Sequence, residues 1–294
     1  MINFMKYKTI YFVISLFFLL PSAFFLTRYG LKPSLDFTGG TLLEFTIQSD
    51  KAITPDQIKD SITSLTPITS LQTTDNNAFL LRAPAFSQAT NQQIQQQLEA
   101  LGQVTETRFE TLGPTLGREL IKKTLIGILI ATSFILLYVA SRFKDKKYGV
   151  CAILAMLHDS LILLGAFSFL GVYRHIEVDA LFVTALLTIL SFSVHDTIVV
   201  YDRIRESLKL NPKLSFTNIV NKAVTETLGR SINNSLTIIF MLLSLYLLGG
   251  PTIKWFIFAL LIGTISGTYS STFTAAPLLV LWEQIKARKS KPTP

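Results

Sequence analysis

The sequence predicts a polytopic α-helical membrane protein with six transmembrane helices and one external α+β domain. Three observations support this fold class. Only 16% of the 294 residues are charged, whereas a soluble domain averages about 25%. Hydrophobic residues make up 49% of the chain, and the mean hydropathy is +0.45. The polar residues gather in one stretch, 30–118, between the first apolar segment and five further ones in close succession.

The composition also excludes several classes of protein. It is not that of a disordered tail, of a disulfide scaffold, or of a nucleic-acid binder recruited by charge alone. Cys151 is the single cysteine, which excludes an intrachain disulfide and a cysteine-cluster metal site. We therefore expect neither a metal nor another cofactor.

Six largely apolar segments approach or exceed the roughly 20 residues that a spanning helix needs. The first has an alternative interpretation as a cleaved signal peptide, but its length and the lack of a small-residue cleavage site favour an uncleaved anchor. The segments are 9–27, 124–141, 148–173, 180–201, 231–253 and 255–282.

The charge distribution predicts the orientation of these spans. Residues 30–118 carry a net charge of −3, whereas the remainder carries +11. Sixteen Lys and Arg residues fall at the N-terminus, after the second and fourth spans, and in the C-terminal tail. Because cytoplasmic loops are enriched in these residues, we expect both termini in the cytoplasm and residues 30–118 outside.

Four regions follow from this arrangement. The expected regions are a cytoplasmic N-terminus with the first span (1–29), the external domain (30–118), a five-helix bundle (119–283) with a cytoplasmic amphipathic segment (202–229), and a basic tail (284–294).

The external domain has the periodicity of a small sheet with two helices. Alternation of apolar residues predicts strands, and Ile58, Ile62 and Leu65 share one helical face. The resulting order, βαββαβ, is a ferredoxin-like split sandwich. The expected elements are a strand at 41–47, a helix from Thr54-Pro55, strands at 68–74 and 78–83 joined by the turn Asp75-Asn76-Asn77, a helix at 88–101 and a strand at 103–112.

Ionisable residues inside the spans are candidates for function, because a charge at membrane depth is unfavourable by about 2.5–3.5 kcal/mol. His158-Asp159 in the third span is consistent with a proton relay or with a hydrogen-bonded pair that fixes helix packing. His195-Asp196 lies in the fourth span, and Arg230 opens the fifth. We expect an Asp196–Arg230 ion pair, in which Arg stays protonated. The alternatives are an interfacial hydrogen-bonding Asp and a snorkelling Arg.

The sixth span has a small-residue face for close helix contact. Gly263 and Gly267 form a G-x-x-x-G pattern, followed by Ser270, Ser271 and Thr272. We interpret this face as a packing surface.

Several motifs resemble those of the SecF family of bacterial protein-export subunits. The segment 35–41 (LDFTGGT) resembles the family's D-F-T-G-G motif, and 196–206 (DTIVVYDRIRE) its D-T-[IV]-V-V-F-D-R-I-R-E signature. The resemblance runs in order from about residue 6 to 282. Further matches are Gly113-Pro114 with Gly117 and Glu119-Leu120, His158-Asp159, 230–235 (RSINNS) and 267–271 (GTYSS). The motif residues to which we give a family role are Asp36, Phe37, Thr38, Gly39, Gly40, Asp202 and Arg203.

The resemblance implies half of an RND-like bundle that pairs with SecD into a twelve-helix unit. It implies no enzyme activity. It also implies assistance to the SecYEG channel and its SecA motor in the bacterial inner membrane, with YajC and YidC as further candidate partners. The family is thought to use the proton-motive force late in polypeptide export. Its proton-coupling residues fall on Asp196 and Arg230. Two positions depart from the family pattern: His195 replaces the usual Asn, and Tyr201 the usual Phe.

Two other functions remain open from the residues alone. The chain could be a passive assembly scaffold whose buried charges only hold a partner subunit, or an RND-type small-molecule exporter. The external domain is small for a substrate pocket of its own, which disfavours the exporter. An intramembrane hydrolase is the least supported, because the sequence has no H-E-x-x-H or G-x-S-x-G motif.

Overall fold

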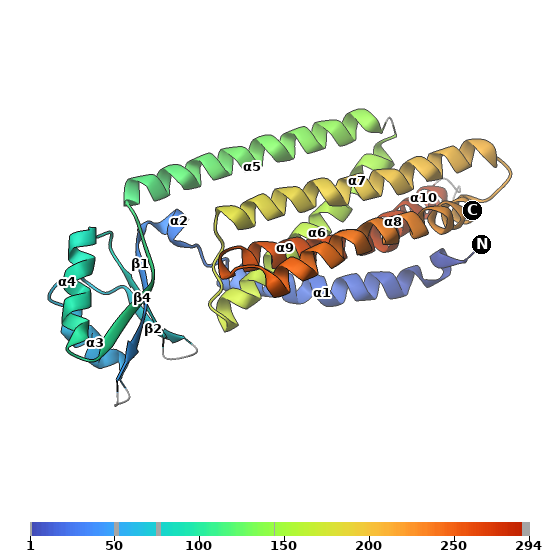
Figure 1. Ribbon diagram of the computed structural model, residues 1–294. Coiled ribbons are helices and arrows are strands. Elements are labelled where there is room, and N and C mark those ends of the chain that lie inside the picture. The colour runs from blue at the N-terminus through green and yellow to red at the C-terminus, as the bar shows by residue number, and fades with distance from the viewer. Residues whose placement is uncertain (1, 50–52, 75–77, 144, 290–294) are drawn as a thin grey trace. The chain divides into compact units, whose positions relative to one another are not determined.

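The computed structural model describes residues 2–49, 53–74, 78–143 and 145–289 (Figure 1). The turn Asp75-Asn76-Asn77 and the predicted loop and tail lysines Lys144 and Lys291 lie outside the described residues. The chain forms two compact units, one of residues 33–126 and one that combines 1–32 with 127–294.

The unit 33–126 contains the predicted antiparallel sheet with two helices on one face (Figure 1). The strand order β2-β3-β1-β4, with every neighbouring pair antiparallel, confirms the ferredoxin-like βαββαβ arrangement. Its elements are α2 (Leu35–Thr38), β1 (Gly40–Gln48), α3 (Pro55–Ile62), β2 (Ser70–Thr74), β3 (Ala78–Ala83), α4 (Gln88–Glu99) and β4 (Gln103–Leu112).

The core of this unit follows from the alternation along β1 and the stripe on each helix. Leu43 and Phe45 point to the covered face of the sheet, and Ile58 and Ile94 from the two helices are fully buried against it. The helix α3 begins at a capping box, in which Thr54 and Gln57 satisfy each other's backbone N–H groups.

The D-F-T-G-G segment and the later G-P-x-x-G segment form one junction. Gly39 and Gly40 have positive φ angles of +65° and +114°, a conformation that favours glycine. A methyl group at Gly39 would lie 2.9 Å from the Cα of Pro114, and one at Gly117 would lie 2.9 Å from the backbone nitrogen of Gly39. The two segments therefore need glycine because each backbone occupies the space of the other's side chain.

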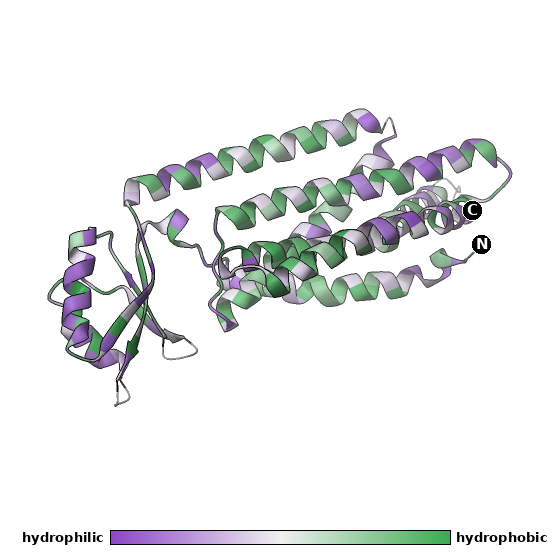
Figure 2. Cartoon of the chain, viewed as in Figure 1, coloured by the Kyte–Doolittle hydropathy of each residue, from purple (hydrophilic) through white to green (hydrophobic). Residues whose placement is uncertain are grey.

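Among the described residues, six helical stretches are long and apolar enough to cross a membrane. Figure 2 shows hydrophobic residues along these helices and polar residues mainly on α3 and α4. The helices are α1 (Lys8–Tyr29), α5 (Pro114–Arg142), α6 (Lys146–Tyr173), α7 (Ala180–Leu210), α8 (Phe216–Leu248), and a last stretch made of α9 (Pro251–Ser270), the π-helix η3 (Ser271–Ala275) and α10 (Ala276–Lys289).

The predicted amphipathic segment 202–229 is helical but does not form a separate helix. Its first residues continue α7, and residues 216–229 open α8. Its apolar residues, among them Ile204, Ile219 and Val224, are buried in the same core as Tyr201. These residues pack against their neighbours, so the helices extend beyond the apolar spans marked by hydropathy.

Glycines allow the closest helix approaches in the bundle. A methyl group at Gly165 of α6 would lie 2.3 Å from the Cα of Ser22 on α1, and one at Gly263 of α9 would lie 2.3 Å from Ile189 Cγ1 on α7. The G-x-x-x-G pattern of α9 thus serves packing at Gly263, as predicted.

We expect Gly165→Ala to destabilise the bundle by about 1–3 kcal/mol, because the added methyl group overlaps the α1 backbone. The free energy of unfolding in detergent measures this effect. Gly127→Ala on α5 is the matched control, since nothing lies within 4 Å of a methyl group there, and we expect it to be neutral or slightly stabilising. Equal losses in the two variants would contradict a steric origin.

Candidate functional site

A buried carboxylate joins three helices at the centre of the bundle. Asp159, midway along α6, has a side chain only 1% exposed. It accepts hydrogen bonds from Ser193 Oγ on α7 at 2.6 Å, and from Ser266 Oγ and Ser270 Oγ on α9 at 2.6 and 2.5 Å. A polar group out of water needs such partners. The predicted pair His158-Asp159 is thus part of a larger polar cluster.

His158 places a second ionisable group on the same carboxylate. Its Nδ1 lies 3.0 Å from Asp159 Oδ1, and its ring lies against Tyr269 of α9 with the centroids 6.4 Å apart. Among the described residues no hydrogen-bond partner is found for His158 Nε2, although the atom is buried. The imidazole also lines a cavity of about 290 Å³ between side chains of α1, α6 and α9.

Asp196 forms a second carboxylate site on α7. It lies midway along the helix and is 6% exposed. Ser231 Oγ on α8 donates to its Oδ2 at 2.8 Å, and Ser271 Oγ, the first residue of the π-helix, donates to the same oxygen. These contacts hold α7 to α8 and to the last helical stretch.

The two carboxylate sites meet at two adjacent serines. Ser270 donates to Asp159, and Ser271 donates to Asp196. The pair stands where α9 passes into the π-helix η3. Single π-helical turns within α-helices are rare and occur frequently at functional sites.

The structure does not contain the predicted Asp196–Arg230 ion pair. Arg230 lies midway along α8, so it does not open the fifth helix as expected, and its side chain is exposed. In the described part of the chain, Asp196 is contacted by serine hydroxyls and has no ion pair. The neighbouring residue Ser231 faces Asp196 in place of Arg230. His195 is exposed and does not join the Asp159 cluster.

The signature residues Asp202 and Arg203 form ion pairs near the end of α7. Asp202 pairs with Arg142 of α5 and with Arg205 Nη1 at 3.1 Å. Arg203 pairs with Glu206 at 2.6 Å and with Glu226 of α8 at 2.7 Å. Pairs this exposed contribute little stability, at most about 1 kcal/mol each. The Asp202–Arg142 and Arg203–Glu226 pairs link neighbouring helices, whereas the other two lie within α7.

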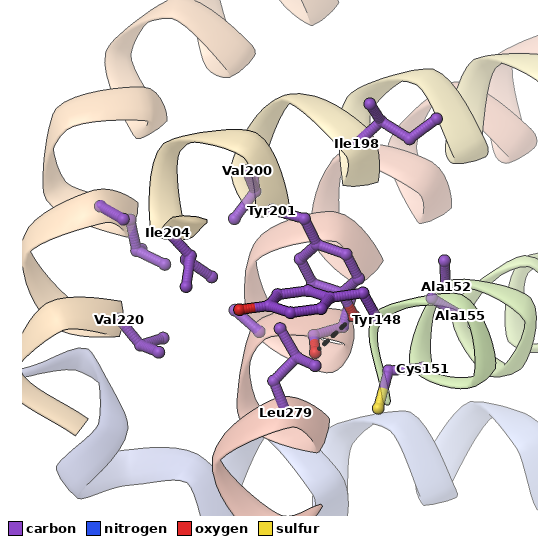
Figure 3. Close-up of a cluster of buried hydrophobic side chains, with 14 of the residues drawn as sticks. Tyr148, Cys151, Ala152, Ala155, Ile198, Val200, Tyr201, Ile204, Val220 and Leu279 are labelled. Atoms are coloured by element: carbon purple, nitrogen blue, oxygen red, sulfur yellow. Dashed lines mark hydrogen bonds between the residues drawn. The ribbon is translucent and has the colours of Figure 1, made fainter. Parts of the chain in front are cut away.

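Tyr201 has a structural partner that the sequence did not indicate. Its hydroxyl, fully buried, donates to the Ala275 carbonyl at the end of the π-helix at 2.9 Å. Figure 3 shows its ring beside that of Tyr148 among small and branched aliphatic side chains, with the centroids 5.4 Å apart. The extra hydroxyl noted in the sequence thus satisfies a backbone carbonyl.

Sequence reasoning missed the serines because a small residue on an apolar helix signals close packing first. Ser193, Ser231, Ser266, Ser270 and Ser271 were not identified as hydrogen-bond donors to the carboxylates. The spacing of Ser266 and Ser270, one turn apart on one helix face, is a weak sign of a shared polar contact. Among the described residues no group of three His, Cys, Asp or Glu side chains could hold a metal.

We expect Tyr201→Phe to lower the free energy of unfolding by about 1 kcal/mol, because the buried Ala275 carbonyl loses its donor. Denaturant unfolding of the purified protein measures the change. Tyr148→Phe is the control, since no hydrogen bond of the Tyr148 hydroxyl is found within the described residues and its ring is also buried. The assignment fails if both variants lose the same stability.

Models of protein families match most of this chain. The model described as "Protein export membrane protein SecD/SecF, C-terminal" matches residues 93–285. The model "SecD/SecF GG Motif" matches residues 24–51, which include Gly39 and Gly40.

Whole-length relatives and solved structures agree with these matches. The protein translocase subunit SecF of Thermobaculum terrenum is 40% identical, over 96% of this chain and 94% of its own. SecDF of Thermus thermophilus is 34% identical over 86% of this chain and 35% of its own. The crystal structure of SecDF, described as a translocon-associated membrane protein of that genus, superimposes with a TM-score of 0.82 at 32% identity, over 96% of this chain and 39% of that one.

Proposed function

We propose that this chain, which belongs to the SecD/SecF family of protein-export membrane proteins as a SecF-type translocase subunit, couples proton movement to polypeptide export through Asp196. The family is one of transporters, and the chain is a multi-pass membrane protein of the Sec translocase. Asp196 carries the proposal, because it is a buried carboxylate whose contacts tie three helical segments together.

Protonation of Asp196 is the proposed coupling step. The ionised carboxylate accepts from Ser231 of α8 and Ser271 of the π-helix. Hydrogen bonds to a charged acceptor are stronger than those to a neutral one, so adding a proton weakens both contacts. The helices α7, α8 and the last stretch can then repack, and the external domain moves in response.

Arg230 acts in a second arrangement of α8. Arg230 and Ser231 are neighbours, so their side chains leave the helix about 100° apart. A rotation of α8 by that angle would bring the Arg230 guanidinium to the position where Ser231 now stands. Arg230 would then pair with Asp196 once the carboxylate has released its proton, and the ion pair would hold the ionised state.

SecD is the proposed partner. The Thermus relative is named SecDF, and this chain matches only 35% of its length. We infer that a separate SecD chain supplies the remainder and a further acidic group.

The other proposed members of the assembly are SecYEG, SecA, YajC and YidC. We also propose a bacterial plasma membrane location, both termini in the cytoplasm, and action late in export.

The experiment reconstitutes the chain with SecD, SecYEG and SecA in proteoliposomes and compares translocation with and without an imposed proton gradient. We expect Asp196→Asn and Arg230→Met to reduce translocation to the level seen without a gradient, while SecD still co-purifies. Glu206→Gln is the control, because this carboxylate lies on the same helix but is exposed.

Two results would contradict the proposal. Full gradient stimulation of Asp196→Asn would remove Asp196 from the coupling step. A loss of SecD co-purification in proportion to the loss of translocation would indicate the passive scaffold instead.

A further inference from the structure

We propose that His158 and Asp159 form a second proton-binding site and that the adjacent residues Ser270 and Ser271 link it to Asp196. The proposal deepens the proposed function, on which it rests for the role of Asp196. Three observations support it: a carboxylate with four polar neighbours, a buried ring nitrogen that has no partner among the described residues, and a two-residue connection between the carboxylates.

Asp159 has four polar neighbours, one for each of the roughly four lone-pair positions of a carboxylate. Ser193, Ser266 and Ser270 all donate to it, and His158 Nδ1 lies 3.0 Å from Oδ1. A serine hydroxyl is both a donor and an acceptor. The same hydroxyls can therefore donate to the ionised carboxylate or accept from the protonated one, so the cluster satisfies both states of Asp159.

In this proposal, Nε2 of His158 is the atom that accepts the incoming proton. When neutral His158 donates from Nδ1 to Asp159, its Nε2 carries the lone pair. Nε2 is buried without a partner in the described part of the chain, and the ring lines the cavity of about 290 Å³. The wall of the cavity is mostly apolar, with hydroxyl groups from Ser15, Ser266 and Tyr269, so the proton would reach Nε2 on a water that enters the cavity transiently.

The proposed transfer moves one proton from water through His158 to Asp159. A proton delivered by water binds Nε2 of His158, which then carries a proton on each ring nitrogen. The Nδ1–H bond breaks as an O–H bond forms on Asp159 Oδ1. The imidazole ends neutral with its proton on Nε2, and Asp159 ends as a neutral carboxylic acid. One proton is taken up, and the net charge of the pair rises by one.

The link to Asp196 runs through the start of the π-helix. Ser270 responds to the state of Asp159, and Ser271 responds to that of Asp196. A change in one serine shifts the backbone of the other, because they share a peptide unit. Ser193 adds a second route, since it lies on α7 one turn before Asp196.

Among the described residues, three titratable side chains face Asp159. They are His158 on α6, Asp196 on α7, which lies beyond the serines, and Tyr269 on α9. The Tyr269 hydroxyl donates to the Tyr11 carbonyl of α1 at 2.8 Å. Tyr residues titrate at about pH 10 when unperturbed. The proton-binding groups of the proposal are therefore His158, Asp159 and Asp196.

Infrared difference spectroscopy tests the second site. The chain is purified with SecD, its aspartates are labelled with ¹³C, and spectra at acidic and neutral pH are subtracted. We expect a protonated-carboxyl band that persists in Asp196→Asn and is lost in Asp159→Asn. The proposal is overturned if the band that persists in Asp196→Asn also persists in Asp159→Asn, or if it is absent from the wild-type protein; the separate Asp196 band is expected to remain in Asp159→Asn.

Ser266→Ala and Ser270→Ala test both the site and its link. Each removes one hydroxyl donor to Asp159 from the same helix, but only Ser270 adjoins the residue that contacts Asp196. Both variants should shift the frequency of the Asp159 band, even if Asp159→Asn does not fold. Only Ser270→Ala should also shift the Asp196 band. An equal response of the Asp196 band in both variants refutes the link.

The second proton site and the coupling role of Asp196 can fail independently of each other. The infrared bands report protonation of each aspartate whether or not export depends on the proton gradient. If Asp196→Asn retains gradient-dependent translocation but the Asp159 band behaves as expected, the coupling role of Asp196 fails while the second proton site stands.

Discussion

The bundle depends on the need of one buried carboxylate for hydrogen-bond donors. Asp159 is 1% exposed at the middle of α6, where a bare charge would be strongly unfavourable. Its donors come from α7 and α9. These two helices must therefore keep a fixed rotation about their axes and a fixed position along them relative to α6. The glycine contacts fit that constraint, because Gly263 lets α9 approach α7 closely one turn before Ser266.

The π-helix serves the same constraint. Two neighbouring residues of a helix point about 100° apart, which allows Ser270 to reach α6 while Ser271 reaches α7. The Tyr201 hydroxyl donates to the Ala275 carbonyl at the end of that turn. This hydroxyl thus supports the segment that contacts both carboxylates.

Patterns local in the chain predicted most of the fold. The spans and the βαββαβ order follow from runs and periods of apolar residues, which depend on only a few neighbours at a time. The extent of α7 and α8 was missed because polar residues such as Arg203 and Glu226 end a hydropathy run without ending a helix. Their ion pair spans the two helices instead.

The two aspartates of the site could be predicted from the sequence, but the residues that donate hydrogen bonds to them could not. Asp159 and Asp196 are identifiable from sequence because charge is rare at membrane depth. Which side chain faces each one depends on the rotation of helices whose contacting residues lie 34 to 111 residues away along the chain. Arg230 and Ser231 differ by a single position, and in this structure that step exchanges the expected ion pair for a hydrogen bond from a neutral hydroxyl group.

A neutral donor at Asp196 has a consequence for coupling. An Asp–Arg ion pair within the membrane would be stable enough to hold the bundle in one state, because separating it leaves two buried charges. Serine donors hold the carboxylate more weakly, and each hydroxyl can also accept a hydrogen bond from the protonated carboxyl group. The structure therefore represents a state in which the carboxylate can gain a proton without the separation of an ion pair. With α8 rotated by about 100°, Arg230 would supply the opposing state, in which the ionised carboxylate is held.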